Sequence, residues 1–181
     1  MRRRMWVHVV LTMCVMLAAM SVGAEQRTLR VALAGFEEDN FDPKFTGGTT
    51  IMRISVPIYD YLTWLSPAFE VVPGLAERWE VSADGRTYTF HLRQGVRFHN
   101  GDPVTAQDVQ FSLTRQMDKD SKNTSAGTFR GMLQSIDVPG PSTIVMRLKA
   151  PDPDLLLNLS PYVGGSPVLP SAYMAVLVLR T

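Results

Sequence analysis

The chain has 181 residues, of which 45% are hydrophobic, and its 18 Lys and Arg nearly balance its 17 Asp and Glu for a formal net charge of +1. This composition is typical of a globular protein with one modest core. Near neutrality argues against the basic surface of a nucleic-acid-binding protein and against the acidic tail of a disordered one.

The first 24 residues have the features of a secretory signal peptide. Three arginines at residues 2–4 precede an apolar run at residues 6–20, and a stretch of small residues ends at Ala24. The run is shorter than the ~20 apolar residues that a membrane-spanning helix needs. We therefore expect cleavage after Ala24 and export of the rest of the chain. An uncleaved membrane anchor and export by the twin-arginine route remain open.

Cys14 is the only cysteine, and it lies inside the apolar run. The exported chain would therefore contain no disulfide, no catalytic thiol and no cysteine-bound metal. Met13 is too large for the position before a lipidated cysteine, which favours a soluble product over a lipid-anchored one.

A strand and a loop are the first elements predicted after the signal peptide. Leucine and valine alternate with other residues over 28–34, which is typical of a strand with one buried face. Residues 36–50 contain Asp42-Pro43 and Gly47-Gly48, which disfavour regular structure, so they predict an irregular loop.

Helical spacing of apolar residues follows between residues 51 and 65 and predicts an amphipathic helix. The apolar positions are Ile51, Ile54, Ile58, Leu62 and Leu65, and Ser55 falls at the same spacing. Pro57 removes a backbone donor, so it either kinks this helix or marks its first turn.

The clearest local pattern is a β-hairpin followed by a helix. Trp79 and Val81 alternate before the Asp84-Gly85 turn, and alternation resumes over residues 88–92. After a second turn, Thr105 is placed to cap a helix with Asp108 three residues later. The apolar face of this predicted helix contains Ala106, Val109, Leu113 and Met117.

Two further elements complete the prediction. Ile144, Met146 and Leu148 alternate as a strand, and Asp152-Pro153 begins a short helix that extends to Leu159. Strands and helices mix along the chain, which indicates an α/β or mixed α+β class.

The block at residues 74–109 carries a resemblance to a known family. It reads GLAERW at 74–79, DGRTYTFHLR at 84–93 and VRFHNGDPVTAQDV at 96–109. This block resembles the hallmark block of the family 5 extracellular solute-binding proteins, which include the dipeptide, oligopeptide and nickel receptors of ABC importers. Phe41-Asp42-Pro43 and Val168-Leu169-Pro170 are similar to flanking segments of the family, so the resemblance covers about residues 28–173.

The resemblance implies part of a two-lobed type II periplasmic-binding-protein-like fold whose second lobe is missing from this sequence. It also implies a monomer that captures a peptide or other small solute outside the cytoplasmic membrane and delivers it to an ABC permease complex. The default ligand is a peptide, with nickel, sugars and other solutes as alternatives. We expect residues 25–175 to form the N-terminal part of the binding domain and the block itself to be structural.

The resemblance places the ligand between the lobes and the loop after the first strand at the cleft. Phe36 or Phe41 would cover an apolar side chain, and Glu37 or Glu38 would meet an amine or cation, with Asn40 beside them. A solvated acidic loop is the simpler alternative for any one of these residues. Tyr162, Gly164 and Gly165 are weaker candidates by position.

Enzyme and cofactor chemistry find little support in the sequence. Glu37 and Asp39 would share a face of an extended chain, but no further pattern indicates glycoside hydrolysis. His91 and His99 have no third metal ligand at a familiar spacing, and no glycine loop followed by lysine indicates phosphate binding. We expect no enzyme activity, no metal and no cofactor.

The last residues, 176–181, do not resemble the family and form an apolar tail. We therefore expect a truncated receptor in which binding is impaired. A periplasmic sensor or hydrolase built on a related domain is the alternative function.

Overall fold

The computed structural model describes residues 42–45, 56–172 and 174, all within one compact unit of the chain, Leu33–Thr181. The expected signal peptide, the strand predicted at 28–34 and the tail at 176–181 lie outside the described residues. Within the described part, no helix is long and apolar enough to cross a membrane.

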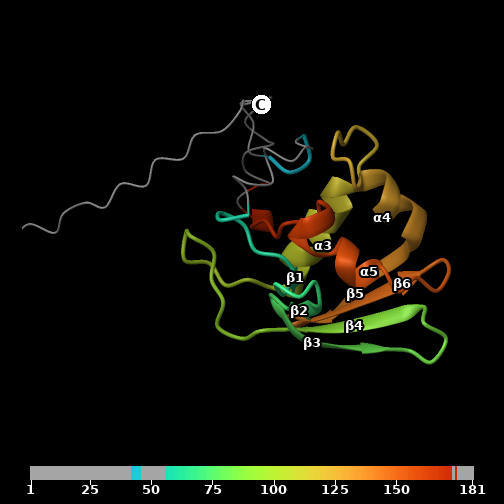
Figure 1. Cartoon of the computed structure of the whole chain (residues 1–181). Helices are drawn as coiled ribbons and strands as arrows, with labels where there is room; N and C mark the ends of the chain where they lie inside the picture. The colour runs from blue at the N-terminus through green and yellow to red at the C-terminus, as the bar shows by residue number, and fades with distance from the viewer. Residues whose placement is uncertain (1–41, 46–55, 173, 175–181) are drawn as a thin grey trace, which may run out of the picture. The chain divides into compact units, whose positions relative to one another are not determined.

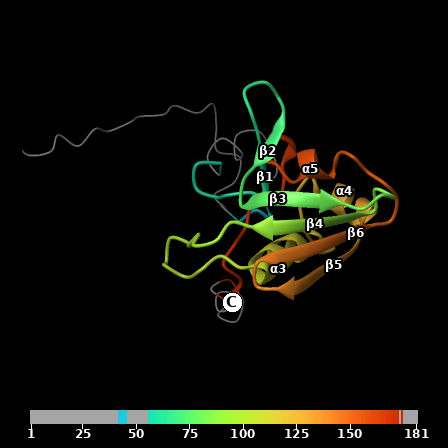
Figure 2. The same cartoon turned by 90° about the horizontal axis from the view of Figure 1, so that it is seen from below.

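A four-stranded antiparallel sheet is the main scaffold, with strand order β3-β4-β6-β5. Its strands are β3 (Ala76–Val81), β4 (Thr87–Leu92), β5 (Leu133–Gly140) and β6 (Thr143–Leu148). The helices cover one face of this sheet, as Figures 1 and 2 show. The mixed α/β class predicted from the sequence is confirmed.

The predicted hairpin and the predicted strand at 144–148 are both confirmed as β3–β4 and β6. Gly85 occupies the turn with φ of 67°, in the left-handed region that glycine adopts without strain. Phe90 lies opposite Ile144 in the register of β4 and β6, and both side chains are fully buried. Alternation along each strand therefore sends one set of apolar side chains to the helix-covered face.

The predicted capped helix is confirmed as α3 (Ala106–Gln116). The Asp108 carboxylate accepts hydrogen bonds from the backbone N–H of Thr105 at 2.9 Å and from its hydroxyl at 2.7 Å. The other oxygen of Asp108 accepts from the backbone and hydroxyl of Ser171. This buried carboxylate therefore starts α3 and also fixes the returning chain near residue 171.

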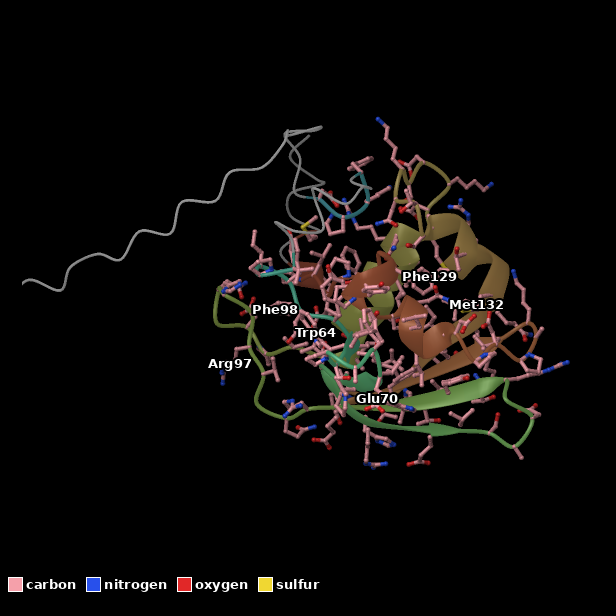
Figure 3. All side chains as sticks on the ribbon, viewed as in Figure 1. Trp64, Glu70, Arg97, Phe98, Phe129 and Met132 are labelled. Carbon is pink, nitrogen blue, oxygen red and sulfur yellow. The ribbon has the colours of Figure 1, made fainter. Side chains whose placement is uncertain are left out.

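The core lies between the sheet and the helices α3, α4 (Ala126–Met132) and α5 (Leu155–Asn158). Phe129 and Met132 of α4 are part of it (Figure 3). The other buried members include Leu62, Tyr88, Phe90, Leu92, Val109, Leu113, Ile144, Met146, Leu148 and Leu155.

The helix predicted over residues 51–65 is wrong for the part that the structure describes. Residues 56–58 form a turn, and β1 (Thr63–Leu65) pairs antiparallel with β2 (Val71–Pro73). The carbonyl oxygens of Tyr61 and Leu62 accept hydrogen bonds from the N–H groups of residues 74–76. These long-range bonds replace the ones that a helix would make, so the apolar spacing alone was misleading.

Other elements differ from the prediction in extent or were not predicted. The short helix predicted to extend to Leu159 is confirmed as α5, followed by the 3-10 turn η1 (Pro161–Val163). The helix α4 escaped prediction because it contains Gly127 and Gly131, which are poor helix formers. The edge strand β5 contains Pro139, which is uncommon in strands.

Candidate functional site

A polar cluster joins three segments that are distant in the sequence. We call it the junction: residues 42–45, the segment 115–125 at the C-terminal end of α3, and residues 160–165. The first of these segments directly follows the loop predicted to contact ligand, and the last contains Tyr162 and Gly164.

Arg115 holds the start of the first segment. Its two terminal nitrogens donate to the two carboxylate oxygens of Asp42, which makes a bidentate pair. The two side chains are only 12% and 18% exposed. A bidentate pair shielded from water fixes both distance and orientation, so the position of Asp42 relative to α3 is well determined.

Lys44 makes the second charged contact of the junction. Its ammonium lies 2.8 Å from a carboxylate oxygen of Asp118 and 2.8 Å from one of Asp120. These hydrogen bonds raise the pKa of Lys44, and the bond from Lys44 lowers the pKa of Asp120. The ring of Phe45 lies beneath both Lys44 and Arg115, at 5.4 and 5.9 Å from its centroid.

Asn123 connects residues 42–45 to the remainder of the junction. Its side-chain NH2 donates to the carbonyl of Pro43 at 2.9 Å. Its side-chain oxygen accepts from the backbone N–H of Ser125 at 2.8 Å and from the amide of Gln116 at 3.0 Å. The backbone oxygen of Lys44 also accepts two bonds from residues 121–122. A single loop therefore holds this segment through both side-chain and backbone groups.

Ser125 extends the junction to the turn η1. Its hydroxyl donates to the carbonyl of Val163 at 3.0 Å. Gly164 has φ of 80°, and a Cβ built on it would lie 2.9 Å from the Ser125 oxygen. A Cβ on Gly165 would lie 2.4 Å from the carbonyl of Ser160. Both glycines are thus required by backbone geometry and close packing.

Tyr162 stands at the surface beside an aromatic residue that the sequence did not indicate. Its ring is 59% exposed and meets Phe69 edge to face, with centroids 5.6 Å apart. Phe69 is 68% exposed and has φ of 62°, an uncommon conformation for a bulky residue. Tyr162 is therefore available to a solute, with Phe69 as its neighbour. The turn at 66–70 gave no sequence signal for this pairing, because the two residues lie far apart along the chain.

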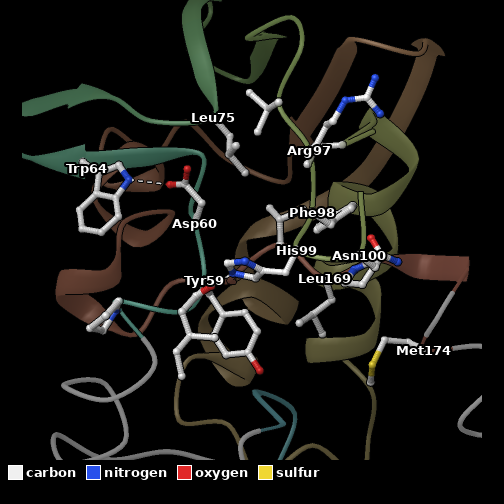
Figure 4. Close-up of a pocket in the computed structure, with 16 residues that line it drawn as sticks. Tyr59, Asp60, Trp64, Leu75, Arg97, Phe98, His99, Asn100, Leu169 and Met174 are labelled. Atoms are coloured by element: carbon white, nitrogen blue, oxygen red, sulfur yellow. Dashed lines mark hydrogen bonds between the residues drawn. The ribbon is translucent and has the colours of Figure 1, made fainter. Parts of the chain in front are cut away.

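Apart from the junction, the structure contains an apolar cavity of about 680 Å³ (Figure 4). Its lining comes from residues 57–60, 96–100 and 168–170, with Trp64, Leu75, Val104 and Met174. Polar groups lie among these residues: Trp64 donates from its indole to Asp60 at 2.8 Å, and a ring nitrogen of His99 lies 3.3 Å from the carbonyl of Ile58.

Tyr59, Arg97 and Phe98 are three of the residues that line this cavity. Burial, and to a smaller extent the charge of Asp42, raise the pKa of Tyr59, which lies on the cavity wall. Arg97 projects outward from the loop after β4, whereas Phe98 turns inward (Figure 3). The hallmark block therefore supplies one wall of the cavity as well as the sheet scaffold.

The predicted site residues separate into two groups. Phe36, Glu37, Glu38, Asp39, Asn40 and Phe41 lie outside the described residues. Tyr162 and Gly164 are described, and the structure links their turn to residues 42–45 through Asn123 and Ser125. The sequence did not indicate Lys44, Arg115 or Asn123. Among the described residues, no group of three or more His, Cys, Asp and Glu could hold a metal ion.

Comparison with known proteins identifies relatives of the chain. It is 39% identical over 146 residues to the dipeptide-binding protein of Escherichia coli. The aligned region covers 75% of this chain and 27% of that protein. The structure resembles that of the PBP AgaA in complex with agropinic acid from A. tumefaciens R10, with a TM-score of 0.71, 30% identity, and coverage of 78% and 28%.

A third relative is the ABC transporter-associated periplasmic binding protein DppA of Helicobacter pylori in complex with the peptide STSA. The TM-score is 0.66 at 29% identity, with coverage of 77% of this chain and 30% of that one. The chain thus spans less than a third of the length of each of these three relatives. Its structure matches part of a periplasmic binding protein fold, which confirms the fold predicted from the sequence. Residues 70–173 match the model of the bacterial extracellular solute-binding proteins, family 5 Middle. The chain belongs to the family 5 bacterial extracellular solute-binding proteins.

Proposed function

We propose that this protein is a receptor component of an ABC importer, capturing peptides or similar small solutes outside the cytoplasmic membrane for delivery to the permease. The observation that carries the proposal is the 39% identity to the E. coli dipeptide-binding protein over 146 residues. The peptide-bound DppA of H. pylori, at 29% identity, supports the same class of ligand.

The junction supports this proposal because it fixes the chain next to both sets of predicted ligand contacts. Asp42 follows the predicted loop 36–41 directly, and the bidentate bond from Arg115 gives that end of the loop a defined position. Ser125 similarly fixes Val163, the neighbour of Tyr162 and Gly164. Solute sites depend on such rigid supports, because an ordered site loses less entropy on binding.

In the proposed complex, each predicted contact has a chemical role. Glu37 or Glu38 meets the ligand amine, and Phe36 or Phe41 covers an apolar side chain, with Asn40 beside them. The exposed ring of Tyr162 adds a further apolar contact, and Gly164 allows the close packing of this turn against Ser125. No cofactor takes part in this capture.

The proposed domain organisation follows the sequence. Residues 1–24 are a signal peptide that directs the chain to the periplasm or the outside of the cell, and residues 25–175 contribute to the solute-binding domain. Residues 176–181 form a tail outside this domain. The exported protein acts as a monomer.

Isothermal titration of the purified exported chain tests the proposal. The probes are the dipeptide Ala-Ala and the tetrapeptide Ser-Thr-Ser-Ala, with glucose as a solute of another class and the E. coli dipeptide-binding protein as the positive control. We expect saturable binding of the peptides and none of glucose.

Two results would contradict parts of the proposal. Absence of binding to both peptides, while the positive control binds, would remove the receptor function for this chain. N-terminal sequencing of the exported protein checks the location separately: a first residue other than Glu25 would contradict the cleavage site.

A further inference from the structure

Two sets of predicted ligand contacts lie more than a hundred residues apart in the sequence, yet one short loop bonds to the chain beside each of them. The loop is residues 118–125, between α3 and α4. It contacts residues 42–45, which adjoin the predicted contacts at 36–41, and it contacts Val163, which lies between Tyr162 and Gly164.

Asn123 lies at the centre of these contacts. Its amide NH2 reaches the carbonyl of Pro43 at 2.9 Å, whereas its amide oxygen receives the backbone N–H of Ser125 at 2.8 Å. Ser125 in turn donates from its hydroxyl to the carbonyl of Val163 at 3.0 Å. Three hydrogen bonds, each between a side-chain group and a backbone group, therefore connect Pro43 to Val163.

Packing around this connection leaves little freedom for it to shift. Ser125 is buried, and a Cβ at Gly164 would lie only 2.9 Å from its hydroxyl oxygen. Gln116, which is 2% exposed, adds a bond to the side-chain oxygen of Asn123 at 3.0 Å. On the other side, Arg115 and the pair Asp118 and Asp120 hold Asp42 and Lys44.

We propose that Asn123 is a positioning residue for solute capture, which holds residues 42–45 and 162–165 at a fixed distance through Pro43 and Ser125. The inference rests on the proposed receptor function. Asn123 acts through other residues, because both ends of its amide are already bonded to the protein. Its contribution to affinity is preorganisation: residues 42–45 and 162–165, each beside or among the predicted contacts, are held in position before the solute binds.

The test uses the substitution Asn123→Asp in the full exported chain. The side chain keeps its shape and its oxygen acceptor, but it loses the NH2 group that donates to Pro43. Asn158→Asp is the matched control, since Asn158 is also half-buried and makes no described side-chain hydrogen bond. Titration with Ser-Thr-Ser-Ala and thermal unfolding are measured for both variants.

We expect Asn123→Asp to weaken peptide binding about tenfold at a temperature well below its unfolding midpoint, whereas Asn158→Asp binds like the wild type. Ser125→Ala, which removes the bond to Val163, should weaken binding to a similar extent. The double variant should be no weaker than either single one, because both substitutions break the same connection. This non-additivity would not arise from two independent losses of stability.

Failure of the inference and failure of the receptor function give different results. Wild-type affinity in Asn123→Asp, or additive losses in the double variant, overturns the positioning role while the receptor function stands. Absence of peptide binding by the wild type overturns both. If Asn123→Asp does not fold, Ser125→Ala alone decides: unchanged affinity in that variant contradicts the connection.

Discussion

The sheet core and the junction are stabilised by different forces. In the core, β4 and β6 place Phe90 opposite Ile144, and fully buried apolar side chains make the contact. In the junction, charges and amides make the contacts, and Asp42 pairs with Arg115 across 73 positions of the sequence. Apolar burial is non-directional, whereas a bidentate pair or an amide fixes orientation. The core therefore supplies stability, and the junction supplies position.

The largest effect is expected in the core. Phe90→Ala removes a fully buried ring of β4 from the core and leaves a cavity, so it should lower the free energy of unfolding by about 3–5 kcal/mol. Urea denaturation followed by circular dichroism measures the loss. Val81→Ala, on the exposed part of neighbouring β3, is the control and should change it by less than about 0.5 kcal/mol. A similar loss in both variants would contradict the assigned core.

A smaller loss is expected when the main ion pair of the junction is broken. Arg115→Ala leaves the mostly buried Asp42 carboxylate without its guanidinium and should cost about 1.5–3 kcal/mol. Arg147→Ala breaks a pair with Asp137 whose side chains are each 51% exposed, and should cost less than about 1 kcal/mol. Urea denaturation of both variants measures the difference. Equal losses would show that the junction pair is no stronger than a surface pair.

Close backbone packing gives a third contrast, between two glycines. A Cβ at Gly74 would lie 2.5 Å from the carbonyl of Tyr61, so Gly74→Ala should destabilise the protein by about 1–3 kcal/mol. Gly127 in α4 has nothing within 4 Å of such a Cβ, so Gly127→Ala should stabilise it by about 0.5–1 kcal/mol. Thermal unfolding reports both signs. A stabilising Gly74→Ala would contradict the close approach of β1 to the segment after β2.

The same contrast explains what the sequence could predict. The hairpin, α3 and β6 depend on local periodicity, turn glycines and a capping pair three residues apart, all of which one sequence displays. The helix predicted over 51–65 was wrong because the same apolar spacing suits either a helix or a strand. In the described part of this segment, hydrogen bonds from the N–H groups of residues 74–76 favour the extended conformation. Local signals therefore predicted the core better than they predicted the site.

The junction was not predictable from one sequence, because its partners are far apart and individually common. Lys44 meets Asp118 and Asp120 across some seventy positions, and nothing near Lys44 identifies those carboxylates. Tyr162 was proposed from its position alone, and its partner Phe69 lies in a turn where glycine would be usual. The ligand contacts predicted at residues 36–41 remain predictions.

The smallest expected effect is a dependence of stability on pH, which the charged pair of Lys44 and Asp120 in the junction should produce. Because the pKa of Lys44 is raised, its pairing stabilises the fold below the ordinary value of 10.5, and this contribution is lost as pH rises through the folded-state value. Because the pKa of Asp120 is lowered, its contribution is present above the ordinary value of 3.8 and is lost as pH falls through the folded-state value. The aliphatic and phenylalanine side chains of the core carry no titratable group and contribute no such dependence.

Substituting Lys44 with methionine should therefore flatten the stability profile at both ends while leaving the core intact. The control is Lys122→Met, since Lys122 lies in the loop 118–125 of the junction with an exposed side chain. Urea denaturation across the pH range measures the free energy of unfolding of the wild type and both variants. The difference between wild type and Lys44→Met should be largest near neutral pH and should narrow in acid and in alkali. A constant difference at every pH would show that Lys44 stabilises the fold through packing on Phe45, not through its charge.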